Sequence, residues 1–325
     1  MTLPRRQFLH LAAAAAVLPA VPRLARAQAY PARAVRWLVP FAPGGSTDII
    51  ARLVGGWLSE RLGQSVIIEN KPGANTQIAT QAVATAPADG YTLLFISTSA
   101  ATNATFYDTL PYNFLRDIAP VSGLVRSPFL LTVNAAVPAK TVAEFMAYAK
   151  ANPGKINMAS TGVGTSPHLA GELFQAMAGI KMVNVPYRGE APAMNDMMAG
   201  QAQVIFGSPA ATLPHIRSGA LRAIAVTGAV RMSALPEVPT IGETLAGYEA
   251  STFYGVGAPK NTPREIVERL NREINAALTS PVIGTRITEL GSAVLTLSTA
   301  EFGKLIADET EKWGKVIRSA SIKPE

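Results

Sequence analysis

The amino-acid sequence predicts an α/β fold divided between two domains. Short apolar runs typical of buried strands alternate with segments of helical periodicity along most of the chain. This alternation occurs as two separate series, with joints rich in proline and glycine near residues 120–138 and 234–260. The length of 325 residues is sufficient for two domains, each with its own hydrophobic core.

The first residues are typical of a secretory signal peptide. A basic start containing Arg5 and Arg6 leads into an Ala/Leu-rich run that ends at small residues around Ala27. We therefore expect residues 1–27 to be removed after export to a bacterial periplasm. The arginine pair followed by Gln-Phe-Leu favours a twin-arginine signal, with the general secretory route as the alternative.

Charge and cysteine content exclude several classes of protein. The net charge is +7, and residues 1–27 hold four arginines and no acid, so removing them leaves +3. That charge is too small to indicate binding to nucleic acid. The chain has no cysteine, which excludes disulfides, thiol catalysis and zinc–cysteine sites. After the signal we find no apolar stretch of roughly 18 residues, so we expect no membrane span.

The first series reads strand–helix–strand–helix–strand. We expect strands at 35–39, 65–69 and 91–97, separated by helices near 47–62 and 76–86. Strands connected through helices in this way form a parallel sheet covered by those helices.

The second series begins with a helix opened by the capping box Thr141–Glu144 and running to about residue 151. The elements expected after it are strands at 155–160, 181–187, 202–207 and 221–228 and helices at 165–178, 191–199 and 209–218.

The last part of the chain has a different rhythm. It contains a predicted strand at 251–260, a helix opened by the box Thr262–Glu265, and a final helix opened by the box Ser298–Glu301. Together with the two joints, this pattern predicts that the chain crosses between the domains twice. We expect residues 30–127 and 252–325 to form one lobe and residues 128–251 to form the other.

One glycine loop lies in each predicted lobe, between a strand and a helix. The first is Pro43-Gly-Gly-Ser-Thr-Asp48 and the second is Ser160-Thr-Gly-Val-Gly-Thr-Ser-Pro-His168. In open α/β sheets, ligands bind at the carboxyl ends of strands, where helix N-termini offer free N–H groups and partial positive charge. Two such loops facing each other would hold an anion from both sides. The alternative is that both are ordinary turns whose glycines serve backbone geometry alone.

Known phosphate and hydrolase motifs do not fit these loops. Neither contains the lysine of a P-loop, Pro167 stands where a dinucleotide-binding fingerprint needs its third glycine, and no G-x-S-x-G is present. A small carboxylate is therefore the simplest anion for the site.

Catalysis and metal binding have little support. His168 lies too close to Ser166 along the chain for the usual serine–base geometry, so we expect it to cap or line the loop. His168 and Glu172 together would supply only two metal ligands. Asp48 suits the first turn of a helix, either structurally or as a ligand contact. We predict no catalytic residue, no metal and no cofactor.

Two further segments are expected to line the same edge. Hydroxyl groups at Ser97, Thr98 and Ser99 follow the third predicted strand, and Tyr187 is amphipathic and ends another. Arg188 either pairs with a carboxylate or is solvated.

Taken together, the motifs make the chain resemble the Bug-type extracytoplasmic solute receptors of the tripartite tricarboxylate transporter system. The segments that carry this resemblance span the mature chain and include "VRWLVPFAPGGSTDIIARL", "APADGYTLLF", "LPYNFLRDIAPVSGLV", "INMASTGVGTSPHLAGELF", "VPYRGEAPAMNDMMAGQAQVIF" and "LPEVPTIGE". The resemblance implies a two-lobed periplasmic binding protein of the type II class. It further implies capture of a carboxylate-bearing solute in the interdomain cleft and delivery to membrane permease subunits, and we expect a monomer.

The resemblance also implies a set of ligand-binding residues. They are Gly44, Gly45, Ser46, Thr47 and Asp48 on one side, Ser160, Thr161, Gly164, Thr165 and His168 on the other, and Ser97, Thr98, Ser99 and Tyr187 as walls.

One departure from the family pattern concerns the residues after the strand at 202–207. Many relatives carry an acidic residue there, whereas this chain has Gly207-Ser208. We therefore expect a less acidic cleft and a mono- or dicarboxylate ligand without an amino group. Two other functions remain open: a ligand-sensing receptor for a signalling system, and a periplasmic hydrolase, for which no convincing nucleophile–base pair is evident.

Overall fold

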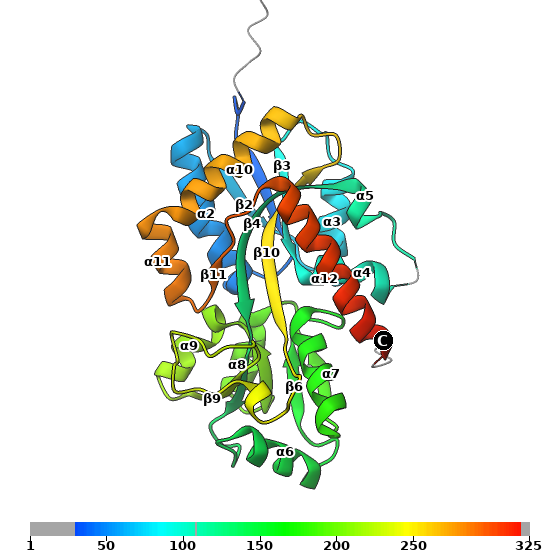
Figure 1. Ribbon diagram of the computed structural model, residues 1–325, viewed down its shortest axis with the longest axis vertical. Coiled ribbons are helices and arrows are strands. Elements are labelled where there is room, and N and C mark those ends of the chain that lie inside the picture. Colours follow the sequence, from blue (N-terminus) through cyan, green and yellow to red (C-terminus); the bar gives the residue numbers. More distant parts are fainter. Residues whose placement is uncertain (1–29, 108, 320–325) are drawn as a thin grey trace, which may run out of the picture.

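The computed structural model describes residues 30–107 and 109–319, and the predicted signal peptide therefore lies outside the described residues. Two β-sheets lie in separate lobes along the long axis of the molecule, and helices flank each sheet (Figure 1). The predicted two-lobed α/β fold is confirmed. In the described part of the chain, no helix is both long enough and apolar enough to cross a membrane.

The first sheet has six strands in the order β11-β4-β10-β3-β1-β2. Strand β1 pairs in parallel with β2 and β3, as the first series predicted, whereas β10 pairs antiparallel with β3 and β4. The strands are β1 (Val35–Val39), β2 (Val66–Asn70), β3 (Thr92–Ser97), β4 (Ile118–Pro128), β10 (Ser251–Pro259) and β11 (Ala293–Val294).

The second sheet has five strands in the order β7-β6-β8-β5-β9. Strand β6 pairs in parallel with β7 and β8, and β5 is antiparallel to both of its neighbours. The strands are β5 (Leu130–Asn134), β6 (Asn157–Ser160), β7 (Val183–Pro186), β8 (Val204–Gly207) and β9 (Leu221–Val226).

The helices divide between the two sheets. Those associated with the first sheet are α2 (Ser46–Leu62), α3 (Gln77–Ala84), α4 (Thr98–Phe106), α5 (Phe114–Asp117), α10 (Arg264–Thr279), α11 (Pro281–Glu289) and α12 (Thr299–Ser319). Those associated with the second are α6 (Val142–Ala151), α7 (Ser166–Ala178), α8 (Glu190–Met198), α9 (Pro209–Arg217) and the short 3₁₀ helix η1 (Ile241–Glu243).

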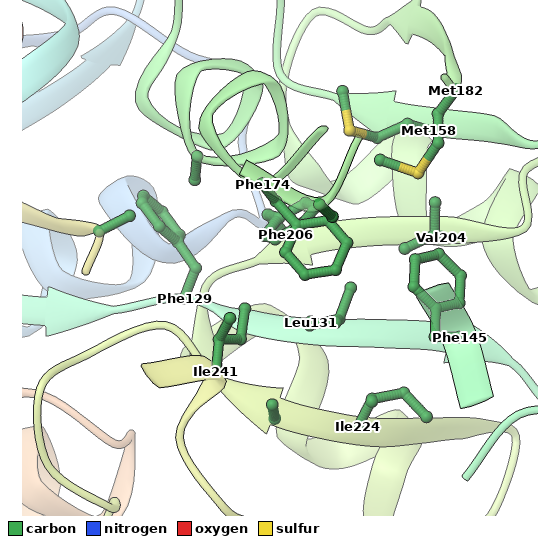
Figure 2. Packing of buried hydrophobic residues seen from close by; sticks show 14 of the residues in the cluster. Phe129, Leu131, Phe145, Met158, Phe174, Met182, Val204, Phe206, Ile224 and Ile241 are labelled. Carbon is green, nitrogen blue, oxygen red and sulfur yellow. The ribbon is translucent and has the colours of Figure 1, made fainter. Parts of the chain in front are cut away.

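Each lobe has an aromatic core. In the first, Trp37 of β1 stacks on Phe95 of β3 with their ring centroids 5.8 Å apart. In the second, Phe174 of α7 packs on Phe206 of β8 with the centroids 5.7 Å apart (Figure 2). These large side chains fix the helices against the sheets and thereby fix the strand ends at which the loops begin.

Two neighbouring chain segments connect the lobes. Strand β4 ends at Pro128 in the first sheet and β5 begins at Leu130 in the second, so only Phe129 separates them. On the return, the Ala250 N–H bonds to Thr227 of the second lobe, and β10 begins at the next residue beside β4. Figure 1 shows β4 and β10 running side by side into the lower lobe. The lobe boundaries at 127/128 and 251/252 remain a prediction.

The last helix joins both lobes. It begins against the first sheet and ends beside α7 of the second lobe (Figure 1), where Trp313 and Ile317 belong to the same buried cluster as Phe174. Near the crossing, its Glu309 carboxylate accepts a hydrogen bond from Arg126 of β4 at 2.9 Å.

Two of the predicted helix starts can be compared directly. The Ser298–Glu301 capping box forms, because each residue accepts a hydrogen bond from the other's backbone N–H. The predicted box at Thr262 is wrong. The Thr262 hydroxyl donates to the Pro259 carbonyl at 2.7 Å, and α10 begins at Arg264 without a side-chain cap.

Candidate functional site

A small cavity lies between the lobes at the carboxyl ends of their strands. Its volume is about 30 Å³, which is room for only about two water molecules. Both lobes line it, with Phe41, Gly45, Ser46, Thr47, Ser97, Ser99, Thr252 and Tyr254 from the first and Phe129, Thr161, Ser166, Pro167 and Glu190 from the second. We call it the inner cavity.

A second and larger cavity adjoins the inner one. Its volume is about 570 Å³, and it shares Phe41 and Thr161 with the inner cavity. Tyr187 and Arg188 also line this outer cavity, which lies between residues of both lobes. The cleft is thus nearly closed at its inner end and open toward the outside.

Helix N-termini converge on the inner cavity. Four helices, α2, α4, α7 and α8, each place first-turn or capping residues in its lining, and α9 begins beside it at Ser208. None of these five N-termini is capped by the side chain of its own N-cap residue. Side chains from elsewhere accept from three N–H groups at these termini, since Glu190 accepts from Ser46 and Ser208 and Ser99 accepts from Ser166. Each N-terminus carries roughly half a positive charge. The described part of the cavity wall contains no Lys or Arg, so backbone dipoles provide its attraction for anions.

In the first glycine loop, the Asp48 side chain bonds back to the loop backbone. The Asp48 carboxylate accepts hydrogen bonds from the Gly44 N–H at 3.0 Å and from Arg52 Nε at 2.9 Å. Burial alone would raise the pKa of Asp48, but the hydrogen bonds from Arg52 and Gly44 outweigh it and lower that pKa. Asp48 does not line the inner cavity, so its carboxylate shapes the loop and leaves Gly45, Ser46 and Thr47 facing the cleft.

In the second loop, the His168 side chain bonds back to the loop backbone. Its Nδ1 accepts a hydrogen bond from the Gly164 N–H at 3.1 Å. Burial lowers the pKa of His168 to about 4, so the ring is neutral at neutral pH and can act as this acceptor. The loop can approach the first lobe closely because position 164 is glycine with a φ of +76°. A Cβ there would lie 2.6 Å from a ring carbon of Phe106.

Four hydrogen bonds join the lobes around the cavity, and one of them links the hydroxyl groups of Ser99 and Ser166 at 3.1 Å. The other three involve backbone N–H groups. The Ser166 N–H donates to Ser99 Oγ at 3.0 Å, and the Ala42 N–H donates to the Arg188 carbonyl at 3.1 Å. The third runs from the Ser46 N–H to Glu190 Oε2 at 3.0 Å. The first loop therefore contacts the start of α8, and the second loop contacts Ser99 at the start of α4. Residues of both loops line the inner cavity from opposite lobes.

Glu190 bears on one expectation from the sequence. The chain lacks an acid at Gly207-Ser208, which predicted a less acidic cleft. The Glu190 side chain instead reaches this place from α8, and its Oε1 accepts a hydrogen bond from the Ser208 N–H at 2.8 Å. An acid distant along the chain therefore stands beside Ser208, while the comparison with relatives and the ligand without an amino group stay predictions.

Hydroxyl groups complete the wall. Ser46 Oγ and the Tyr254 hydroxyl lie within hydrogen-bond distance at 3.0 Å, and burial raises the pKa of Tyr254, which keeps that hydroxyl protonated. Ser97 Oγ is buried and has no hydrogen-bond partner in the described part of the chain, although Ser97 lines the cavity. Such a group is positioned to bind a polar atom of a ligand.

The predicted site residues fall into two groups. Six line the inner cavity, namely Gly45, Ser46, Thr47, Ser97, Ser99 and Thr161. The others lie behind or beside it, namely Gly44, Asp48, Thr98, Ser160, Gly164, Thr165, His168 and Tyr187. Thr98 accepts a hydrogen bond from the Phe253 N–H, and the Tyr187 hydroxyl donates to Asp196, so both side chains are already engaged.

Sequence reasoning missed seven residues of the inner wall. They are Phe41, Phe129, Ser166, Pro167, Glu190, Thr252 and Tyr254. Phe41, Ser166 and Pro167 stand within or next to the glycine loops, and Glu190 immediately precedes the helix predicted at 191–199, so a local signal existed for these four. The other three come from the crossing segments, where no motif marks them. Among the described residues, no group of three or more His, Cys, Asp or Glu side chains could hold a metal ion.

The comparisons with known proteins identify the family of this chain. Residues 50–322 match the family model described as "Tripartite tricarboxylate transporter family receptor". The chain is 38% identical over 302 residues to the protein BugT of Bordetella pertussis, an alignment that covers 91% of this chain and 92% of the relative.

Two solved structures from Rhodopseudomonas palustris are similar throughout. Rpa4515 with adipate has a TM-score of 0.89 and 36% identity, covering 91% of this chain and 100% of that one. MatC with bound malate has a TM-score of 0.85 and 30% identity, covering 89% of this chain and 100% of that one. The chain therefore belongs to the receptor family of the tripartite tricarboxylate transporters.

Proposed function

We propose that this protein is a periplasmic receptor that holds a small organic acid between its lobes and delivers it to a membrane permease. The convergence of five helix N-termini, none capped by its own N-cap side chain, on one interlobe cavity carries this proposal. Such a centre attracts a carboxylate through oriented N–H groups without any basic side chain. The similar structures that hold adipate and malate support the same ligand class.

Residues 1–27 serve export in this proposal, and the receptor acts as a monomer after their removal. Its partners are the acid and the permease subunits of a tripartite transporter. Family membership supports the periplasmic location, because the matched family consists of transporter receptors.

The receptor leaves its ligand chemically unchanged. His168 is the histidine nearest the site along the chain, and its Nδ1 is occupied by the Gly164 N–H. The Ser166 hydroxyl bonds to the Ser99 hydroxyl, and among the described residues neither serine side chain is hydrogen-bonded to a histidine or a carboxylate. A serine hydrolase needs a base within hydrogen-bond reach of its nucleophile.

Closure of the cleft is the working step. A ligand that contacts both loops binds the closed form better than the open form, and this difference in affinity shifts the population toward closure. Moving it from 1:99 to 99:1 requires about 5.5 kcal/mol. Two to four hydrogen bonds to a charged group, at about 1.5–3 kcal/mol each, suffice.

The experiment is a melting-temperature screen of the purified protein against mono-, di- and tricarboxylates, aromatic acids and amino acids. We expect one or a few acids to raise the melting temperature, because a ligand that binds only the folded state stabilises it. The variant Gly45→Val should abolish this shift, since its side chain enters the cavity against Glu190.

The matched control is Gly56→Val in the same helix, where a Cβ meets no atom within 4 Å. It should keep the shift. If no acid stabilises the wild-type protein, or if Gly45→Val responds like Gly56→Val, the proposed site is wrong.

A further inference from the structure

The inner cavity already contains one carboxylate of the protein itself. Glu190 is the first residue of α8, and its side chain is only 6% exposed. Oε2 accepts from the Ser46 N–H at 3.0 Å and Oε1 accepts from the Ser208 N–H at 2.8 Å. One oxygen is thus bonded to the first lobe and the other to the second.

This carboxylate occupies a position suited to an anion. The N-termini of α2, α8 and α9 meet at it, because Ser46, Glu190 and Ser208 are their first or capping residues. Each terminus is equivalent to roughly half a positive charge, so one carboxylate offsets about two of them. The chain holds Glu190 there tightly, because Gly189 allows its backbone to approach the first lobe. A Cβ at 189 would lie 3.1 Å from the Ala42 nitrogen.

The rest of the inner cavity faces the N-termini of α4 and α7. Ser97 is the N-cap residue of α4 and is 2% exposed, and its Oγ has no hydrogen-bond partner among the described residues. Ser166 begins α7 and borders the same cavity. The remaining space of the inner cavity borders these two helices, and Glu190 is the only Asp or Glu in the described wall.

We propose, on the basis of the function proposed above, that Glu190 is a selectivity-determining residue that fills one of two anion positions in the inner cavity. The ligand's own carboxylate takes the position at α4 and α7. The part of the ligand next to Glu190 is then uncharged, or donates a hydrogen bond through a hydroxyl group. Two carboxylates in one site repel each other, so the receptor prefers monocarboxylates to dicarboxylates of the same chain length.

The test compares binding constants for matched acids, hexanoate with adipate and butanoate with succinate, by calorimetry near neutral pH. The measured quantity is the ratio of the two affinities within each pair. We expect the wild-type ratio to favour the monoacid. Both Glu190→Gln and Glu190→Ala should shift it toward the diacid by about tenfold or more, since neighbouring carboxylates disturb each other by at least about one pKa unit. If a substitution weakens closure of the cleft in general, the affinities for both acids of a pair fall equally, and their ratio does not change.

The control is Glu172→Gln, which removes one charge from α7 of the same lobe at a residue outside the cavity wall. Its ratio should equal that of the wild type. An unchanged ratio in the Glu190 variants, with both acids still bound, overturns the inference and leaves the proposed function intact. An equal shift in Glu172→Gln also overturns it. If no acid binds the wild-type protein, the proposed function itself fails.

A second measurement tests the same anion position by thermal stability, in case the Glu190 variants fold too poorly for calorimetry. Formate, a carboxylate without a side chain, should raise the melting temperature of Glu190→Ala more than that of the wild type by filling the vacated position. Equal effects of formate on both proteins would show that Ser46 and Ser208 do not form an anion position.

Discussion

Substituting Gly164 by alanine tests whether ligand binding depends on close contact between the two lobes. A Cβ at this position would lie 2.6 and 2.7 Å from two ring carbons of Phe106 and 2.8 Å from the Asn75 amide nitrogen. Phe106 and Asn75 belong to the first lobe and Gly164 to the second. The added methyl group therefore forces the cleft to open or Phe106 to move.

The magnitude follows from the cost of overpacking. Forcing a methyl group into a packed site costs about 1–3 kcal/mol. Because the clash occurs only when the lobes meet, this cost weakens ligand binding by about 5- to 150-fold, at 1.4 kcal/mol per factor of ten. Part of the effect arises from the positive φ of +76°, which disfavours alanine whatever its surroundings.

The matched control is Gly162→Ala in the same loop. Its φ is also positive, at +128°, but a Cβ there would meet only Thr165 and Tyr187 of its own lobe, at 3.4 and 3.8 Å. Calorimetric titration of both variants with the acid that most stabilises the wild type separates the two effects. Equal losses of affinity in the two variants would refute the argument, because backbone strain alone would then explain the result.

Two further predictions concern stability. The pKa of His168 is lowered to about 4 from an ordinary value of 6.5, so the folded state binds this proton less well than the unfolded state. Above pH 6.5, neutral His168 costs the folded state nothing. As the pH falls from 6.5 toward 4, the unfolded state binds the proton and the free energy of unfolding decreases by about 1.4 kcal/mol per pH unit. Urea unfolding at several pH values should show a steeper loss in the wild type than in His168→Gln, and parallel curves would contradict the assignment. Phe174→Ala removes a fully buried ring of the second lobe and should lower the free energy of unfolding by about 3–5 kcal/mol. A change below about 1 kcal/mol would show that the core relaxes around the lost ring.

Regular periodicity made most of the fold predictable. Strands such as Val35–Val39 and helices such as Ser46–Leu62 have apolar runs and boundary residues that can be recognised locally. Strand β4 was missed because Pro120, Gly123 and Pro128 suggest a loop, whereas pairing with β10 makes this segment a strand. Helix α4 was missed because Ser, Thr and Asn dominate its first turns, a composition that is typical of loops.

The candidate site was predictable only where the sequence places its parts together. Gly45, Ser46 and Thr161 belong to loops whose glycine content marks them directly. Tyr254 and Phe129 reach the cavity through the crossing segments, and the position of their side chains depends on how the two lobes pack. Glu190 shows the same limit, because its contact with Ser46 spans 144 residues of sequence.

The reliance on backbone N–H groups has a consequence for how such a receptor can diversify. Substitutions leave main-chain donors in place, provided that the helix start is preserved. Binding of the carboxylate can therefore persist when the surrounding side chains change. Those side chains contact the remainder of the ligand. A new ligand preference then requires only a few side-chain substitutions, and the receptor still binds a carboxylate after each one.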